Sequence, residues 1–177
     1  MREMVGEYDV PNRAPRISYP FLLSVCFGVI TLAGSNAMIK ARWEHFSHPA
    51  DVGVRGIGAT REEAFQQAAL AMMAVITDPQ HVTARDVFEL ELDSKEDDLL
   101  LVDWLNRLIY EMNTRGMLFG RFDVWVDTPH LRARVWGEKL SVRKHKPAVE
   151  VKAATYHQAA VYQEASGAWI AQCVVDV

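Results

Sequence analysis

The segment of residues 45–58, with the sequence HFSHPADVGVRGIG, combines a constrained turn with the strand that follows it. Pro49 fixes its own φ and favours an extended conformation for His48, so Asp51 is presented at the entrance of the strand. An aspartate in a turn commonly hydrogen-bonds its own backbone, and it can also bind a metal or orient a partner group. The segment alone leaves these alternatives open.

The chain closes on an apolar strand pattern at residues 169–177 that carries acidic groups at its end. Asp176 stands beside the terminal carboxylate of Val177, and with Asp51 they form an oxygen-rich trio. Calcium and magnesium prefer oxygen ligands, so the trio suggests a cation site. Such a site requires the strand after Asp51 and the last strand to be neighbours. Zinc or manganese stays open because two histidines stand near Asp51: His45 and His48.

The rest of the chain alternates helix and strand patterns. Apolar spacing and capping boxes predict two helices, one from Thr60-x-x-Glu63 to Asp78-Pro79 and one from Ser94-x-x-Asp97 to residues 113–116. Alternating apolar residues predict strands at residues 42–57, 87–92, 122–126, 131–136, 149–162 and 169–177. The strand over 149–162 would place Glu150 and Lys152 on one exposed face. This order of elements indicates an α+β two-layer sandwich, with two helices packed on a mixed sheet of about six strands.

Composition restricts the function. The chain has 177 residues and a net charge of −4, and residues 1–37 contribute none of that charge. An acidic body argues against direct binding of nucleic acid through a broad basic face, and it is compatible with a basic protein partner or a cation. The two cysteines give no disulfide framework. The sequence also lacks a phosphate-binding glycine loop, an HExxH motif, a CxxC pair and a nucleophile elbow.

Residues 1–37 differ from the remainder and form a separate leader in our interpretation, with a single domain at residues 38–177. Residues 17–39 carry no charge and follow two arginines, which is the pattern of a signal peptide or of a membrane anchor. The alternative is that translation starts at Met38 and the preceding residues are upstream sequence.

The body resembles the archease family, the accessory proteins of the RNA-splicing ligase. The resemblance covers residues 38–177 and is carried by motifs in order: HFSHPADVG at 45–53, EEAF at 62–65 with ALAM at 69–72, LVDWLN at 101–106, Gly137-Glu138, EVKAATYH at 150–157 and the terminal VDV at 175–177. The family is cytosolic, which favours the start at Met38 and a cytoplasmic location. One departure is Ser141, where family members commonly carry an acidic residue.

The resemblance implies a function and a set of site residues. It implies a non-catalytic activator that promotes guanylylation and repeated turnover of a GTP- and manganese-dependent RNA ligase, with tRNA reached only through the ligase. It implies a divalent cation, most commonly calcium, at Asp51, Asp176 and Val177. It also implies a surface that reaches the ligase active site, which we place at five residues: His48, His145, Glu150, Lys152 and His157.

Two other classes of function remain open from the residues. One is a metal-dependent hydrolase that uses Asp51, Asp176 and His48, and the other is a binding module stabilised by calcium. Capture of the ligase by the purified protein separates the activator from both. A screen of the isolated protein against phosphoesters separates the hydrolase from the binding module.

Overall fold

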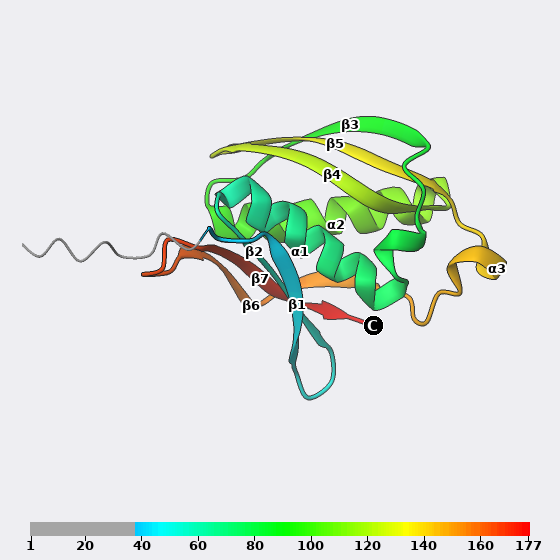
Figure 1. Ribbon diagram of the computed structural model, residues 1–177, viewed down its shortest axis with the longest axis horizontal. Helices are drawn as coiled ribbons and strands as arrows, with labels where there is room; N and C mark the ends of the chain where they lie inside the picture. Colours follow the sequence, from blue (N-terminus) through cyan, green and yellow to red (C-terminus); the bar gives the residue numbers. More distant parts are fainter. Residues whose placement is uncertain (1–37) are drawn as a thin grey trace, which may run out of the picture. The chain divides into compact units, whose positions relative to one another are not determined.

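The structure is a computed structural model that describes residues 38–177, so the expectations for residues 1–37 fall outside it. Within the described range, one antiparallel sheet has the strand order β1-β2-β7-β6 and a second has the order β3-β5-β4 (Figure 1). The strands are β1 (Arg42–Ser47), β2 (Val52–Gly58), β3 (Asp86–Asp93), β4 (Met117–Asp127), β5 (His130–Lys139), β6 (Ala153–Gln163) and β7 (Trp169–Asp176).

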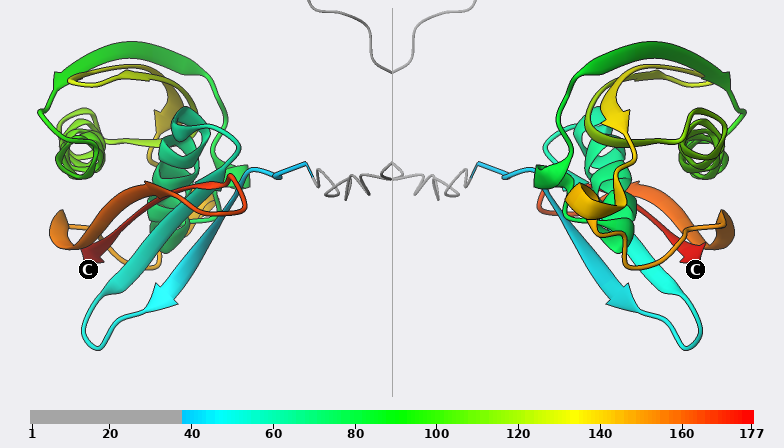
Figure 2. Two further views of the ribbon diagram at one scale, coloured as in Figure 1. Left: turned by 90° about the vertical axis from the view of Figure 1, so that its left-hand side faces the viewer. Right: turned by 90° about the vertical axis from the view of Figure 1, so that its right-hand side faces the viewer.

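The two long helices, α1 (Arg61–Ile76) and α2 (Asp97–Arg115), lie between the sheets (Figure 2). α1 packs on β2 and β7 on one side and on β4 on the other. α2 packs mainly on β6 and also meets β3 and β4. Eight of the sixteen residues of α1 are buried, so the helix has apolar residues over much of its circumference and needs cover on two sides.

The α+β class predicted from the sequence is confirmed, and the predicted layering is corrected. In place of two helices on one mixed sheet of about six strands, residues 38–177 form seven strands in two antiparallel sheets, with the helices between them. Apolar periodicity reports that an element is buried, but not on how many sides or beside which strand.

Close contact between α1 and β2 depends on Gly56. A Cβ at this position would lie 2.0 Å from the carbonyl oxygen of Ala64 and 2.3 Å from the backbone nitrogen of Ala68. A larger residue would therefore push the strand away from the helix. This packing fixes β2, and with it the turn that carries Asp51.

The start of α1 agrees with the prediction from the sequence, and the start of α2 does not. Thr60 caps α1 by accepting a hydrogen bond from the backbone N–H of Glu63 at 3.2 Å, as predicted. α2 begins at Asp97 after Glu96, which makes no side-chain cap, so the predicted Ser94 capping box is wrong. Asp97 instead pairs with Arg61 at 2.7 Å, a tertiary contact that local spacing does not reveal.

Shorter elements complete the chain: the turn η1 (Pro79–His81) after α1 and the single-turn helix α3 (Val142–His145) after β5. β6 begins at Ala153 rather than at residue 149, so residues 149–152 precede the strand. Cys173 of β7 is free, and burial raises the pKa of its thiol to about 12. No helix within residues 38–177 is long and apolar enough to cross a bilayer.

Candidate functional site

Strand register brings Asp51 and Asp176 to the same end of the four-stranded sheet. β2 and β7 are antiparallel neighbours in which Val52 pairs with Val175, so Asp51 and Asp176, the next residue on each chain segment, lie at the same end of the two strands. β6 flanks the other side of β7, with Ala153 paired to Asp176. The expectation that the strand after Asp51 and the last strand are neighbours is confirmed.

Lys152 lies across the last residues of β7. Its ammonium group donates a hydrogen bond to the main-chain oxygen of Val177 at 3.0 Å and lies 3.9 Å from Oδ1 of Asp176. Its backbone N–H also donates to the carbonyl oxygen of Asp176 at 2.9 Å. The side chain is 61% exposed, so the cation faces both these oxygens and the solvent. The sequence predicted that Lys152 shares a strand face with Glu150. In the structure both residues precede β6, and Lys152 contacts Asp176.

His48 contacts Asp51 within the turn between β1 and β2. Its Nδ1 lies 3.5 Å from Oδ2 of Asp51, but this contact lacks hydrogen-bond geometry. Nδ1 is buried and has no hydrogen-bond partner among residues 38–177. A buried polar atom without a partner is costly, so this nitrogen marks a place where a small movement or a ligand would complete the site.

An irregularity in β6 brings His157 to His48. The ladder between β6 and β7 shifts register between Thr155 and Ala160, and Gln158 within the shift has a positive φ of 53°. The ring centroids of His157 and His48 are 5.1 Å apart in an edge-on arrangement. Bulges commonly redirect side chains in this way beside functional sites.

The structure separates His45 from this cluster. His45 lies on β1, where its Nε2 is 2.8 Å from the carbonyl oxygen of Ala71 on α1. The ring therefore ties β1 to α1, while His48 alone of this pair stands beside Asp51.

His145 is buried, which corrects its predicted place on a partner surface. The backbone N–H of Ser141 donates to its Nδ1 at 2.9 Å, so Nε2 carries the proton and donates to Oε1 of Glu138 at 3.2 Å. Lys144 also pairs with Glu138. The backbone N–H of Thr83 donates a further hydrogen bond to Oε1 of Glu138 at 2.7 Å. Lys144 foremost, then this N–H, lowers the pKa of Glu138 to about 2. The cluster is structural: it holds α3 against β5.

Asn106 of α2, like His145, has a structural role that the sequence did not reveal. Its side-chain amide donates to the carbonyl oxygen of Ala154 and accepts from the backbone N–H of Ala154, both at 2.9 Å. This two-way clamp fixes the start of β6 on α2. Lys152 stands two residues earlier, so the clamp also positions the cation over Asp176.

The oxygen atoms at this end of the sheet have the chemistry that a hard cation needs. Asp51 and Asp176 offer carboxylates and Val177 offers a main-chain oxygen, which are ligand types that calcium accepts. Residues 38–177 contain no cluster of three or more His, Cys, Asp or Glu side chains placed to hold a metal. The predicted set, with two side-chain carboxylates, stays a prediction that needs further ligands from water or from a partner.

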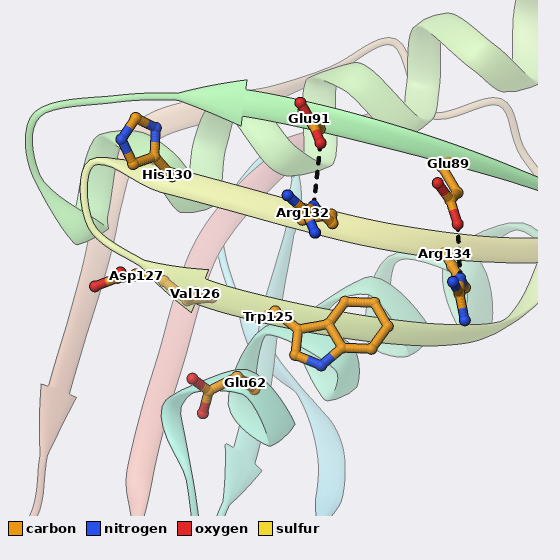
Figure 3. A pocket seen from close by; sticks show the side chains of 9 residues that line it. All are labelled: Glu62, Glu89, Glu91, Trp125, Val126, Asp127, His130, Arg132 and Arg134. Carbon is orange, nitrogen blue, oxygen red and sulfur yellow. Dashed lines mark hydrogen bonds and ion pairs between the residues drawn. The ribbon is translucent and has the colours of Figure 1, made fainter.

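A hollow of about 810 Å³ lies along the three-stranded sheet, where residues of β3, β4 and β5 and Glu62 of α1 line it (Figure 3). Neither Asp51 nor Asp176 is among its lining residues. Its floor is a ladder of exposed ion pairs, Arg132 with Glu91 at 3.0 Å and Arg134 with Glu89 at 2.7 Å. These cations are already paired across the strands and do not converge on a common point, so the hollow shows no catalytic arrangement.

Residues 43–177 match the archease protein family (MTH1598/TM1083). The chain belongs to the archease family. It is 38% identical over 140 residues to the protein archease of Pyrococcus abyssi and 39% identical to that of Thermococcus gammatolerans, covering 77% of this chain and 99% of each relative.

Solved structures of family members share the fold. The solution structure of Methanobacterium thermoautotrophicum protein 1598 is 34% identical, superposes with a TM-score of 0.68, and covers 76% of this chain and 98% of its own. A crystal structure from Thermotoga maritima, titled an archease and possible chaperone, is 18% identical with a TM-score of 0.51, and covers 76% of this chain and 96% of its own. That second likeness bears on the fold alone.

Proposed function

We propose that this archease-family protein is an accessory protein that activates an RNA-splicing ligase by promoting its guanylylation. The observation that carries the proposal is the placement of Asp51, Asp176 and Lys152 at one end of the four-stranded sheet, where Lys152 contacts Asp176. The Lys152 side chain is exposed and the two carboxylates are partly exposed, which suits a surface that completes another protein's active site. Family membership supports the same role.

Asp51, Asp176 and Val177 would hold a divalent cation, with calcium the best match to their oxygen atoms. When bound, the ion would supply positive charge that offsets the carboxylates and would help to order the turn and the strand end. His48 supports the carboxylate role of Asp51, because its unpartnered Nδ1 lies 3.5 Å from Oδ2 and a small movement would let it orient the carboxylate. A histidine that orients a ligating carboxylate is a common outer-shell arrangement.

Lys152 would supply the charge that reaches the partner. Its side chain is mostly exposed, and its backbone is fixed by the hydrogen bond to Asp176. Guanylylation concentrates negative charge on the triphosphate of GTP, and a positioned ammonium group stabilises such charge. His157 and Glu150 are exposed residues near this cation in sequence, and we include both in the activating surface.

The test is transfer of labelled GMP to the purified cognate ligase, measured with and without this protein. We expect the parent chain to raise the rate and to allow repeated turnover. Asp51→Asn and Asp176→Asn should each reduce the stimulation by about tenfold or more, since each removes a charge held at the proposed contact. Asp86→Asn is the matched control, because Asp86 is an exposed aspartate at the start of β3 on the other sheet.

The proposal fails if the parent chain leaves the rate of guanylylation unchanged. It also fails in its residue assignment if Asp51→Asn and Asp176→Asn stimulate the ligase as well as Asp86→Asn does. Thermal unfolding of each variant shows whether a loss of stimulation comes from unfolding.

A further inference from the structure

An apolar cleft of about 450 Å³ opens where the carboxyl-terminal ends of α1 and α2 meet the segment that precedes β6. Ile76 of α1 and Met112 of α2 form part of its wall, and Leu140 and Val149 form part of its rim. Leu140 is 44% exposed and Val149 is 43% exposed. Large aliphatic side chains left to water around a concave site are typical of a protein-binding surface.

The segment that contributes Leu140 and residues 147–151 to this cleft is basic, in contrast to the chain as a whole. Residues 139–152 carry five lysines or arginines and one carboxylate, that of Glu150, although the net charge of the chain is −4. Lys144 and Lys152 are engaged with Glu138 and Asp176. Arg143 and Lys146 are exposed and have no carboxylate within ion-pair distance among residues 38–177. Two cations without an ion-pair partner among residues 38–177 therefore lie in the chain between the lining residues Leu140 and Pro147, and the lining itself carries one charge, that of Glu150.

We propose that this cleft binds a segment of the ligase in which an apolar side chain is flanked by acidic residues. The apolar side chain would fill the cleft, and the acidic residues would pair with Arg143 and Lys146. The inference rests on the proposed function and adds to it an anchoring contact. Glu150 lines the cleft, and Lys152 two residues later reaches Asp176, so one partner can cover both surfaces.

The lining of the cleft favours a protein over RNA or a membrane. None of its lining residues is aromatic, whereas proteins that bind single-stranded RNA stack the bases on aromatic side chains. A depression of this size accepts one or two side chains, which differs from the flat apolar face with which a helix lies on a bilayer. Charge complementarity then selects an acidic segment, because like charges would repel a basic one.

The test is the dissociation constant of the complex with the purified cognate ligase, measured by biolayer interferometry at two salt concentrations. Val149→Glu places a charge in the cleft, and Arg143→Glu reverses a cation in the segment between the lining residues Leu140 and Pro147. We expect each to weaken binding by about tenfold or more, and Arg143→Glu to reduce the salt dependence. Val87→Glu is the matched control, since Val87 is 55% exposed on β3 of the other sheet. We expect it to bind within about twofold of the parent.

A guanylylation assay distinguishes the anchoring contact at the cleft from the activating surface at Asp51 and Asp176. Saturating amounts of Val149→Glu should restore stimulation, whereas Asp51→Asn should stay impaired at any concentration. The inference is overturned if Val149→Glu binds the ligase as tightly as Val87→Glu does. It is also overturned if the parent binds labelled single-stranded RNA or phosphatidylserine vesicles and Val149→Glu loses that binding alone. A parent chain that neither binds nor stimulates the ligase would remove the proposed function and this inference together.

Discussion

Glu138→Gln should destabilise the fold in a manner that depends on pH. The pKa of Glu138 falls from 4.5 to about 2, with Lys144 as the largest cause, and the carboxylate side chain is 9% exposed. A shift of this size corresponds to about 3 kcal/mol at most. Lys144 is 42% exposed, so water screens part of the attraction, and we expect a loss of about 2 kcal/mol at pH 7.

The direction of the pH dependence follows from the lowered pKa. The unfolded chain protonates this carboxyl near pH 4.5, and the folded chain holds it ionised to about pH 2. Its stabilisation is therefore fully present above about pH 5 and is lost as the pH falls from 4.5 towards 2. Urea unfolding of the parent and of Glu138→Gln at pH 7 and pH 3 measures this, and the difference should shrink to less than half at pH 3.

The control is the same substitution in an exposed ion pair. Glu89 pairs with Arg134 on the outer face of the three-stranded sheet, and both side chains are more than half exposed. Glu89→Gln should cost under about 1 kcal/mol. If Glu138→Gln costs no more than Glu89→Gln, or if its cost is the same at pH 3 and pH 7, the cluster around Glu138 does not stabilise the protein as described.

Three further predictions concern the site and its support. Calcium should raise the melting temperature of the parent, because at a hundred times its dissociation constant it adds about 2.7 kcal/mol to the free energy of unfolding, and Asp51→Ala or Asp176→Ala should abolish the rise. Lys152→Met should change stability by under about 0.5 kcal/mol, yet slow guanylylation of the ligase. Asn106→Ala should cost about 2 kcal/mol in urea unfolding, because it leaves both backbone groups of Ala154 without their partner.

Local sequence rules predicted what depends on neighbouring residues. The Thr60 cap and the stop at Asp78-Pro79 are local hydrogen-bond and backbone effects, and the structure confirms both. The Ser94 cap is wrong: α2 begins at Asp97, and this residue pairs with Arg61, which is far from it in sequence. No spacing rule reports such a contact.

The sequence likewise predicted part of the candidate site and missed another part. The adjacency of the strands after Asp51 and before Val177 could be predicted, because acidic groups at two strand ends suggested a common cation. The burial of His145 could not, since its neighbours Lys144 and Lys146 are exposed cations typical of a surface segment. Only the tertiary contacts to Glu138 and Ser141 turn this histidine inwards.

The position of Lys152 connects the proposed cation to the proposed activation. Its ammonium group now contacts oxygen atoms of Val177 and Asp176, the same groups that would hold calcium. Calcium and the ammonium group would repel each other at these oxygens, so we expect calcium binding to move the ammonium group away while the backbone hydrogen bond to Asp176 keeps the residue in place. The freed cation would then face the partner. Lys152→Met should therefore bind calcium more tightly than the parent in isothermal titration, although it activates the ligase less. Equal calcium affinity in the two proteins would show that the ammonium group and the ion do not compete.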